Sequence, residues 1–179
     1  MLQTESALLL LIDFQERLVP SIHNHEDLEK KTAAFIRGCR ILDVPVLTMQ
    51  QYTKGLGDTT DALKGALGKF KYIEKITFSC CGNAEFIDKL NASGKKNIII
   101  AGVEAHICVQ QTVLDLLSNG FNVYVVADCI GSRYERDYDF AIDRMRQEGA
   151  FVTTMESVLF EFLVRADHPN RNEISNLVK

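Results

Sequence analysis

The chain has 179 residues, of which 46% are hydrophobic and 25% are charged, and its formal net charge at pH 7 is -4. This composition is typical of a folded globular protein, and the length predicts one domain that spans residues 1–179. A negative net charge leaves no basic excess to neutralise phosphates, so we expect no nucleic-acid partner.

The first apolar run, Ala7 to Ile12, is too short for a signal-peptide core or a membrane span and is typical of a buried strand. We therefore expect a cytoplasmic protein without membrane contact, in which the five cysteines are reduced. Their odd number and irregular spacing predict neither a disulfide framework nor a zinc site. The adjacent residues Cys80 and Cys81 are interpreted as two packed thiols, with a redox role left open.

Six short apolar runs predict β-strands. They are apolar at consecutive positions, which is typical of parallel strands that helices cover on both faces. The runs are Ala7–Asp13, Pro45–Gln50, Tyr72–Ile76, Asn97–Ala101, Val123–Ala127 and Phe151–Thr154.

Amphipathic stretches between these runs predict helices. The three clearest are Leu28–Leu42, His106–Ser118 and Tyr134–Glu148. Gly120 and Gly149 follow the last two as stop signals. The alternation of strands and helices predicts an α/β fold with three layers, in which a doubly wound, mostly parallel sheet has six strands. The C-terminal run Val158–Val164 fits either a packed helix or a subunit interface.

In such sheets ligands bind outside the carboxyl ends of the strands, and reactive side chains gather there in this sequence. Asp13 ends the first strand, Lys75 lies in the third, and Cys108 begins the helix after the fourth. A helix N-terminus favours a thiolate, so we expect the pKa of Cys108 to be lowered. Each residue alone also fits a structural role, but together they form a plausible nucleophile, base and electrostatic stabiliser.

The segment GVEAHICVQQTVLDLLSNGFNVYVVADCIGSR resembles the nucleophile region of isochorismatase-like cysteine hydrolases. The similarity continues in LLLLIDFQERL, in QQYTKGLGDT and in EKITFS, in the family's order over essentially the whole chain. The GLG loop and the EAH-x-CV-x-QT motif are most similar to those of uncharacterised isochorismatase-domain proteins.

The resemblance implies a role for each matching residue. Cys108 would attack a carbonyl carbon, Asp13 would move the proton, and Lys75 would stabilise both by its charge. A thioester would form, and water would then cleave it. The backbone amides of Glu104 and Cys108 would form the oxyanion hole, and the Val103–Glu104 peptide bond is expected to be cis, as in the family.

The substrate pocket is expected to depend on Phe14, Gln51, Tyr52, Phe78 and the GLG loop. His106 lies close to Cys108 in sequence and fits a substrate contact or a structural histidine equally well. Gly102 would give the backbone room beside the cis peptide. Asp128 and Arg133 are interpreted as structural, a cap or loop brace with a paired arginine.

Metal-dependent relatives place an aspartate and two histidines in the loop after the second strand. The corresponding residues here, Gln50 to Gly57, include neither type, so we expect no metal and no other cofactor. His23 and His25 offer only a weak candidate for loose metal binding.

The retained thiol predicts a hydrolase that acts on a small amide-, imide- or ureide-type C–N bond. One alternative is an isochorismate-type vinyl-ether hydrolase, which needs acid catalysis rather than a thiol. Another is a non-catalytic oligomeric protein that keeps the fold. A nucleotide-binding domain is disfavoured because DFQERL, not G-x-G-x-x-G, follows the first strand. Since relatives commonly assemble, we expect a homo-oligomer that binds a small-molecule substrate.

Overall fold

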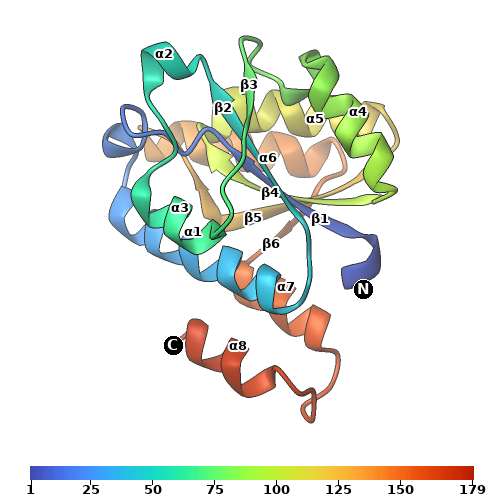
Figure 1. Cartoon of the computed structure of the whole chain (residues 1–179). Coiled ribbons are helices and arrows are strands. Elements are labelled where there is room, and N and C mark those ends of the chain that lie inside the picture. The colour runs from blue at the N-terminus through green and yellow to red at the C-terminus, as the bar shows by residue number, and fades with distance from the viewer.

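The computed structural model describes residues 1–179, and one sheet of six parallel strands lies between two layers of helices (Figure 1). The strands are β1 (Ala7–Ile12), β2 (Val46–Gln51), β3 (Ile73–Lys75), β4 (Asn97–Val103), β5 (Asn122–Gly131) and β6 (Phe151–Thr153). Their order in the sheet is β3-β2-β1-β4-β5-β6. The predicted three-layer, doubly wound α/β fold is therefore confirmed, and every strand pair is parallel.

The strand order fixes where a binding crevice can form. From β1 the chain adds β2 and β3 on one side, and it then returns to add β4, β5 and β6 on the other. β1 and β4 are therefore neighbours at the point where the winding reverses, and the crevice of an open α/β sheet lies outside their carboxyl ends.

Eight helices and four short helical turns connect the strands. The helices are α1 (His25–Ile41), α2 (Thr53–Leu56), α3 (Asp61–Leu67), α4 (Ala84–Ser93), α5 (Gln110–Ser118), α6 (Glu135–Gln147), α7 (Met155–Leu163) and α8 (Arg171–Leu177). The turns are η1 (Thr4–Ser6), η2 (Val19–Ser21), η3 (Cys80–Gly82) and η4 (Ala105–Val109). No helix is both long and apolar enough to cross a membrane.

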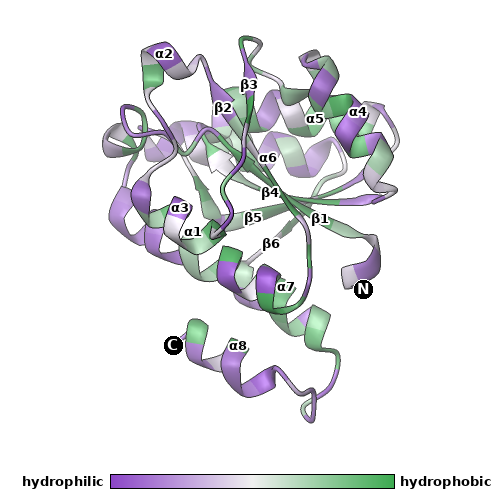
Figure 2. Cartoon of the chain, viewed as in Figure 1, coloured by the Kyte–Doolittle hydropathy of each residue, from purple (hydrophilic) through white to green (hydrophobic).

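The consecutive apolar residues of β1 supply both faces of the sheet, because successive side chains of a strand point to opposite sides. Leu9 and Leu11 belong to the core cluster that includes residues of α1, α3, α7 and α8. Leu8 and Leu10 belong to the cluster that includes residues of α4, α5 and α6. Figure 2 shows the hydrophobic strands at the centre and the hydrophilic outer faces of the helices.

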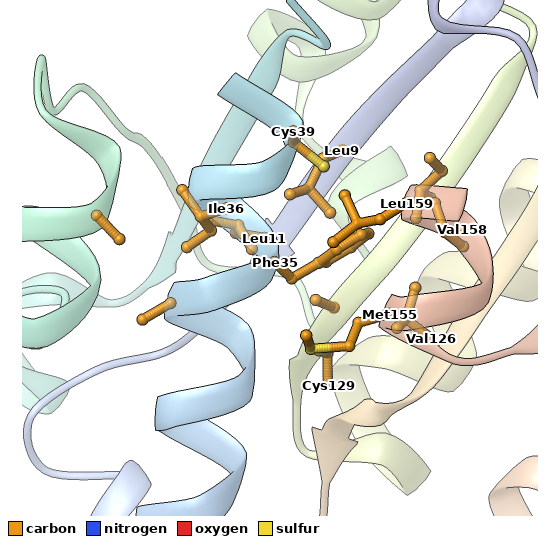
Figure 3. Packing of buried hydrophobic residues seen from close by; sticks show 14 of the residues in the cluster. Leu9, Leu11, Phe35, Ile36, Cys39, Val126, Cys129, Met155, Val158 and Leu159 are labelled. Atoms are coloured by element: carbon orange, nitrogen blue, oxygen red, sulfur yellow. The ribbon is translucent and has the colours of Figure 1, made fainter. Parts of the chain in front are cut away.

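On the first face, α1 and α7 pack together against β1. Figure 3 shows Phe35 of α1 between Leu11 of β1 and Leu159 of α7. A Cβ atom on Gly38 of α1 would lie 2.6 Å from Leu159, so the two helices approach closely where α1 carries no side chain. The C-terminal apolar run is thus a packed helix, as one of its two interpretations predicted.

Several element bounds differ from the sequence-based expectation. β5 runs on to Gly131, beyond the predicted end, because its pairing with β4 shifts at a bulge between Ile100 and Gly102. The helices α2, α3, α4 and α8 were not predicted; α2 has four residues, α3 and α8 have seven each, and α4 has ten. Gly120 and Gly149 adopt positive φ angles of 78° and 106°, which agrees with their predicted role as stop signals.

Gly102 provides a test of this packing. An alanine Cβ at Gly102 would lie 2.6 Å from Cβ of Ile12 and 2.8 Å from its carbonyl oxygen. We expect Gly102→Ala to lower the free energy of unfolding by about 1–3 kcal/mol, as overpacking typically does. The matched control is Gly65→Ala in α3, where a Cβ meets nothing within 4 Å. It should raise stability by about 0.5–1 kcal/mol. Urea denaturation measures both, and equal effects would contradict the close approach of β1 and β4.

Candidate active site

Asp13 follows directly after β1 and turns the chain away from the sheet. Its φ angle of 57° lies in the left-handed region, which aspartate tolerates better than most residues. Its N–H donates to the carbonyl of Met49 at 3.2 Å, and its carbonyl accepts from the N–H of Gln15 at 2.7 Å. These bonds fix the fully buried carboxylate at the carboxyl edge of the sheet.

Lys75, the last residue of β3, forms a buried ion pair with Asp13. The distance from Nζ to Oδ2 is 2.7 Å, and both side chains are 0% exposed. The other carboxylate oxygen of Asp13, Oδ1, is buried and has no N–H or O–H partner. A buried ion pair is tolerated only where further hydrogen bonds offset the loss of hydration.

Lys75 has those further bonds. Nζ donates to Oε1 of Gln51 at 2.7 Å and to the carbonyl of Phe78 at 2.9 Å, with the carbonyl of Thr77 farther away at 3.4 Å. Gln51 is the last residue of β2 and lies beside Lys75 in the sheet register. The ammonium is therefore held from three sides.

Gln15 holds the end of β2 in place, and sequence reasoning assigned it no role. Its side-chain amide accepts from the N–H of Gln51 at 2.7 Å and donates to the carbonyl of Gln51 at 3.0 Å. It also donates to the carbonyl of Gly57 at 2.7 Å. The buried amide replaces the strand neighbour that β2 loses where β1 turns away at Asp13. Its position two residues after Asp13 was the only signal in the sequence.

Cys108 lies in η4, a single π-helical turn that leads into α5. The carbonyl of Cys108 accepts from the hydroxyl of Thr112 at 2.6 Å, and that hydroxyl accepts from the N–H of Cys80 at 3.0 Å. Thr112 therefore ties the start of α5 to η3. The thiol lies near enough to Asp13 and Lys75 for each of them to alter its pKa.

The expected lowering of the Cys108 pKa is wrong for this structure. Burial, together with the negative charge of Asp13, which outweighs the opposing charge of Lys75, raises the pKa of Cys108 to about 12. The helix dipole, on which that expectation rested, is outweighed because the thiol is only 6% exposed and lies beside a carboxylate. Cys108 is thus a protonated thiol until a base takes its proton.

Asp13 and Lys75 also titrate abnormally. Burial raises the pKa of Asp13 above the ordinary aspartate value, and the charge of Lys75 offsets only part of this. Burial lowers the pKa of Lys75, but the charge of Asp13, the neighbouring thiols of Cys80 and Cys108 and the hydrogen bond to Asp13 together outweigh it, and the net shift is upward. An aspartate with a raised pKa beside a buried thiol is a stronger base than an exposed one.

The Val103–Glu104 peptide bond is cis, as the resemblance implied. The N–H of Glu104 donates to no protein acceptor. The carboxylate of Glu104 accepts from the backbone N–H of Arg133 at 3.0 Å and from its Nε at 3.1 Å. Asp128 accepts from the N–H of Met155 at the start of α7. Asp128 therefore acts as the predicted aspartate cap, whereas Arg133 braces the loop by pairing with Glu104 and not with Asp128.

The structure places the predicted pocket residues in different surroundings. Tyr52 and Phe78 are 49% and 55% exposed. Phe14 is placed differently, because its side chain is 2% exposed and lies within the core cluster beneath α1. His106 faces the loop after β5, with Nδ1 2.9 Å from Oγ of Ser132 and Nε2 3.8 Å from Asp137. Its contacts favour the structural interpretation.

A second hollow of the surface lies away from Asp13, Lys75 and Cys108. A cleft of about 210 Å³ between α1 and the end of β5 is lined by Asp27, Lys31, Asp128 and Tyr138, among others, and includes none of the three candidate catalytic residues. No three His, Cys, Asp or Glu side chains lie close enough together to hold a metal ion. The candidate site is therefore described by the thiol, the carboxylate and the ammonium.

Comparison with known proteins places this arrangement in a family. The model of the isochorismatase domain matches residues 7–157, which span all six strands. The chain belongs to the isochorismatase family. The isochorismatase-like resemblance recognised in the motifs is thereby confirmed, and the family is one of hydrolases.

Relatives of this isochorismatase-family protein cover nearly its whole length. Isochorismatase domain-containing protein 2 of Danio rerio is 37% identical over 177 residues, which are 99% of this chain and 89% of the relative. MAR1 ribonuclease from Caenorhabditis elegans has a TM-score of 0.93 at 35% identity, over 99% of this chain and 91% of that one. The Escherichia coli YcaC gene product has a TM-score of 0.89 at 28% identity, over 98% and 86% respectively. YcaC is described as an octameric hydrolase of unknown specificity.

The charge of Asp13 leads to a prediction about the thiol. Asp13→Asn removes the negative charge that raises the pKa of Cys108, so the thiol should ionise at lower pH. Below the pKa, alkylation of Cys108 by iodoacetamide should become about tenfold faster for each pKa unit lost. Peptide mapping by mass spectrometry measures this rate residue by residue.

Asp115→Asn is the matched control, because Asp115 lies on α5 and contacts Ser79 rather than the Cys108 thiol. Labelling of the fully buried Cys39 reports unfolding in every variant. Alkylation of Cys108 that is unchanged or slower in Asp13→Asn would contradict the assigned cause of the raised pKa.

Proposed function

We propose that this protein hydrolyses a small amide-, imide- or ureide-type C–N bond, with Cys108 as the nucleophile. The observation that supports this most strongly is that the two oxygens of the Asp13 carboxylate have different surroundings. Oδ2 of Asp13 is bound by Lys75, whereas Oδ1 is buried without a hydrogen-bond partner. The carboxylate lies near enough to the Cys108 thiol to raise its pKa. An unpartnered buried carboxylate oxygen is costly, and it suits an atom that accepts a proton during a reaction.

The first half of the proposed reaction transfers the acyl group to the protein. Oδ1 of Asp13 takes the proton of Cys108 while the sulfur attacks the carbonyl carbon, forming the S–C bond of a tetrahedral intermediate. Asp13 then gives the proton to the leaving nitrogen, the C–N bond breaks, and a neutral amine or amide departs. A thioester on Cys108 remains.

The second half returns the protein to its starting state. Asp13 takes a proton from a water molecule whose oxygen attacks the thioester carbon. The C–S bond breaks, the acid product leaves, and the Cys108 sulfur recovers its proton from Asp13. General acid–base transfer of this kind contributes typically about 10²–10⁴-fold in rate.

Lys75 and the backbone would provide the electrostatic part of the reaction. The charge of the ammonium offsets part of the effect of burial, which raises the pKa of Asp13 and so favours its protonated form. The N–H of Glu104, which has no protein acceptor, is proposed to donate to the carbonyl oxygen together with the N–H of Cys108. One such oxyanion donor is worth about 3 kcal/mol of barrier lowering.

Two other readings receive less support. A vinyl-ether hydrolase needs an acid at the substrate oxygen and gives the thiol no part in the reaction. A non-catalytic protein would give no reason to bury Asp13, Lys75 and Cys108 together at one strand edge. The ribonuclease name belongs to the Caenorhabditis elegans relative. For this chain, the net charge of -4 and the acyl-transfer set of side chains favour a small neutral substrate over RNA.

The proposal includes a cytoplasmic homo-oligomer that acts on a small molecule without a cofactor, as a single domain over residues 1–179. The octameric state described for the Escherichia coli relative supports the homo-oligomer. Tyr52, Ile76 and Phe78 form an exposed apolar rim beside Lys75, which fits a largely uncharged substrate or a neighbouring subunit.

A substrate screen tests the proposed reaction. Small amides, ureides and imides are offered to the wild type and to Cys108→Ala, and ammonia or amine release is measured. We expect turnover of at least one compound by the wild type and its loss in Cys108→Ala. Cys81→Ala is the matched control, because Cys81 is a partly exposed thiol in η3 whose pKa responds to Asp115 and Ser79. It should keep full activity.

Mass spectrometry of Cys108 peptides from acid-quenched reactions should show an acyl adduct on the thiol. Pyruvate release from isochorismate by Cys108→Ala would instead identify the vinyl-ether activity. Turnover of an amide that survives Cys108→Ala would contradict the nucleophile.

A further inference from the structure

Lys75 has as many strong hydrogen bonds as it has protons. A lysine ammonium carries three donors and no acceptor. Its three short contacts are Asp13 at 2.7 Å, Gln51 at 2.7 Å and the carbonyl of Phe78 at 2.9 Å. All three short contacts of the ammonium are therefore with oxygen atoms. Lys75 also lies close enough to the Cys108 sulfur to lower the pKa of the thiol, both by its charge and as a hydrogen-bond donor, so the sulfur competes with these oxygens for the ammonium.

The Gln51 contact is fixed in its orientation. Because lysine can only donate, the atom of Gln51 that faces it must be the oxygen. The nitrogen of the same amide donates to the carbonyl of Ile76 at 2.7 Å, which prevents the amide from turning over. Gln15 holds the main chain of Gln51 at both its N–H and its carbonyl. Gln51 is thus held at the backbone and at both ends of its side chain.

From this geometry we infer that Gln51 is a positioning residue, which occupies one proton of Lys75 with a neutral oxygen and so directs the ammonium to Asp13 as its only anionic partner. A carboxylate in place of the Gln51 amide would give the Lys75 ammonium a second anionic partner besides Asp13. An apolar side chain would release one N–H, and that donor would be free to turn toward the Cys108 sulfur. This role goes beyond the substrate contact that the sequence predicted for Gln51.

The groups that face Lys75 determine how substitutions should act. They are Asp13 after β1, Cys80 in η3 and Cys108 in η4. Both Asp13 and Lys75 already alter the pKa of Cys108, in opposite directions. A substitution at Gln51 that weakens or strengthens the pull of Lys75 on the thiol should therefore change the thiolate fraction at a fixed pH.

The test measures alkylation of Cys108 by iodoacetamide at a fixed pH below its pKa. In Gln51→Glu an added negative charge lies against Lys75, and we expect alkylation about tenfold slower, equal to one pKa unit. In Gln51→Leu a proton of Lys75 is released toward the thiol, and we expect alkylation to become about threefold faster or more. A merely structural role would move both variants in the same direction.

Two controls accompany the measurement. Cys81, alkylated in the same sample, is an internal reference that should keep its wild-type rate. Gln111→Glu adds the same charge to an exposed position on α5, three residues after Cys108, and should leave the Cys108 rate unchanged. Circular dichroism confirms that each variant is folded.

Rates that change in the same direction in both Gln51 variants, or in neither, would overturn the inference. If Gln51→Glu fails to fold, the Gln51→Leu rate decides alone, and a slower or unchanged rate overturns it. The inference rests on the proposed function, in which Cys108 is the nucleophile. The readout needs no substrate, so activity retained in Cys108→Ala would refute the proposed function without changing the alkylation result.

Discussion

The ion pair between Asp13 and Lys75 sets the constraints on the rest of the site. The two residues end strands that are not neighbours, because β2 lies between β1 and β3. Their side chains therefore meet across the end of β2, which must stop at Gln51, and both Asp13 and Tyr52 take left-handed backbone angles as the chain leaves the sheet. Loss of one partner from such a pair typically costs about 3–5 kcal/mol, because the other charge stays buried and unpaired.

The same pair explains how a buried thiol can serve as a nucleophile. Burial and the neighbouring carboxylate hold the pKa of Cys108 at about 12, so the resting thiol is protonated and unreactive. Burial also raises the pKa of Asp13, which brings the proton affinities of the proposed base and the proposed nucleophile closer together. Proton transfer then needs no permanently ionised sulfur. Thr112 and Gln15 act on neither charge directly, but they fix the two chain segments that carry Cys108 and Gln51.

The sequence predicted the features that depend on local pattern. Consecutive apolar residues such as those of β1 indicated strands buried on both faces, and the order of motifs placed Asp13, Lys75 and Cys108 at one edge of the sheet. It predicted poorly what depends on tertiary surroundings. The helix position of Cys108 suggested a lowered pKa, but desolvation and Asp13 reverse the shift. Gln15 acts on residues some 36 positions away, and no spacing rule reveals such a contact.

The most direct test of the central claim is a titration of the Asp13 carboxyl carbon by NMR in selectively labelled protein. The structure predicts a pKa above the ordinary aspartate value of 3.8, because burial outweighs the charge of Lys75. In Lys75→Met the pKa should rise further, since the only ammonium facing the carboxylate is gone. An Asp13 that titrates at or below the ordinary value, with no response to Lys75→Met, would contradict the claim that this buried pair creates the catalytic base.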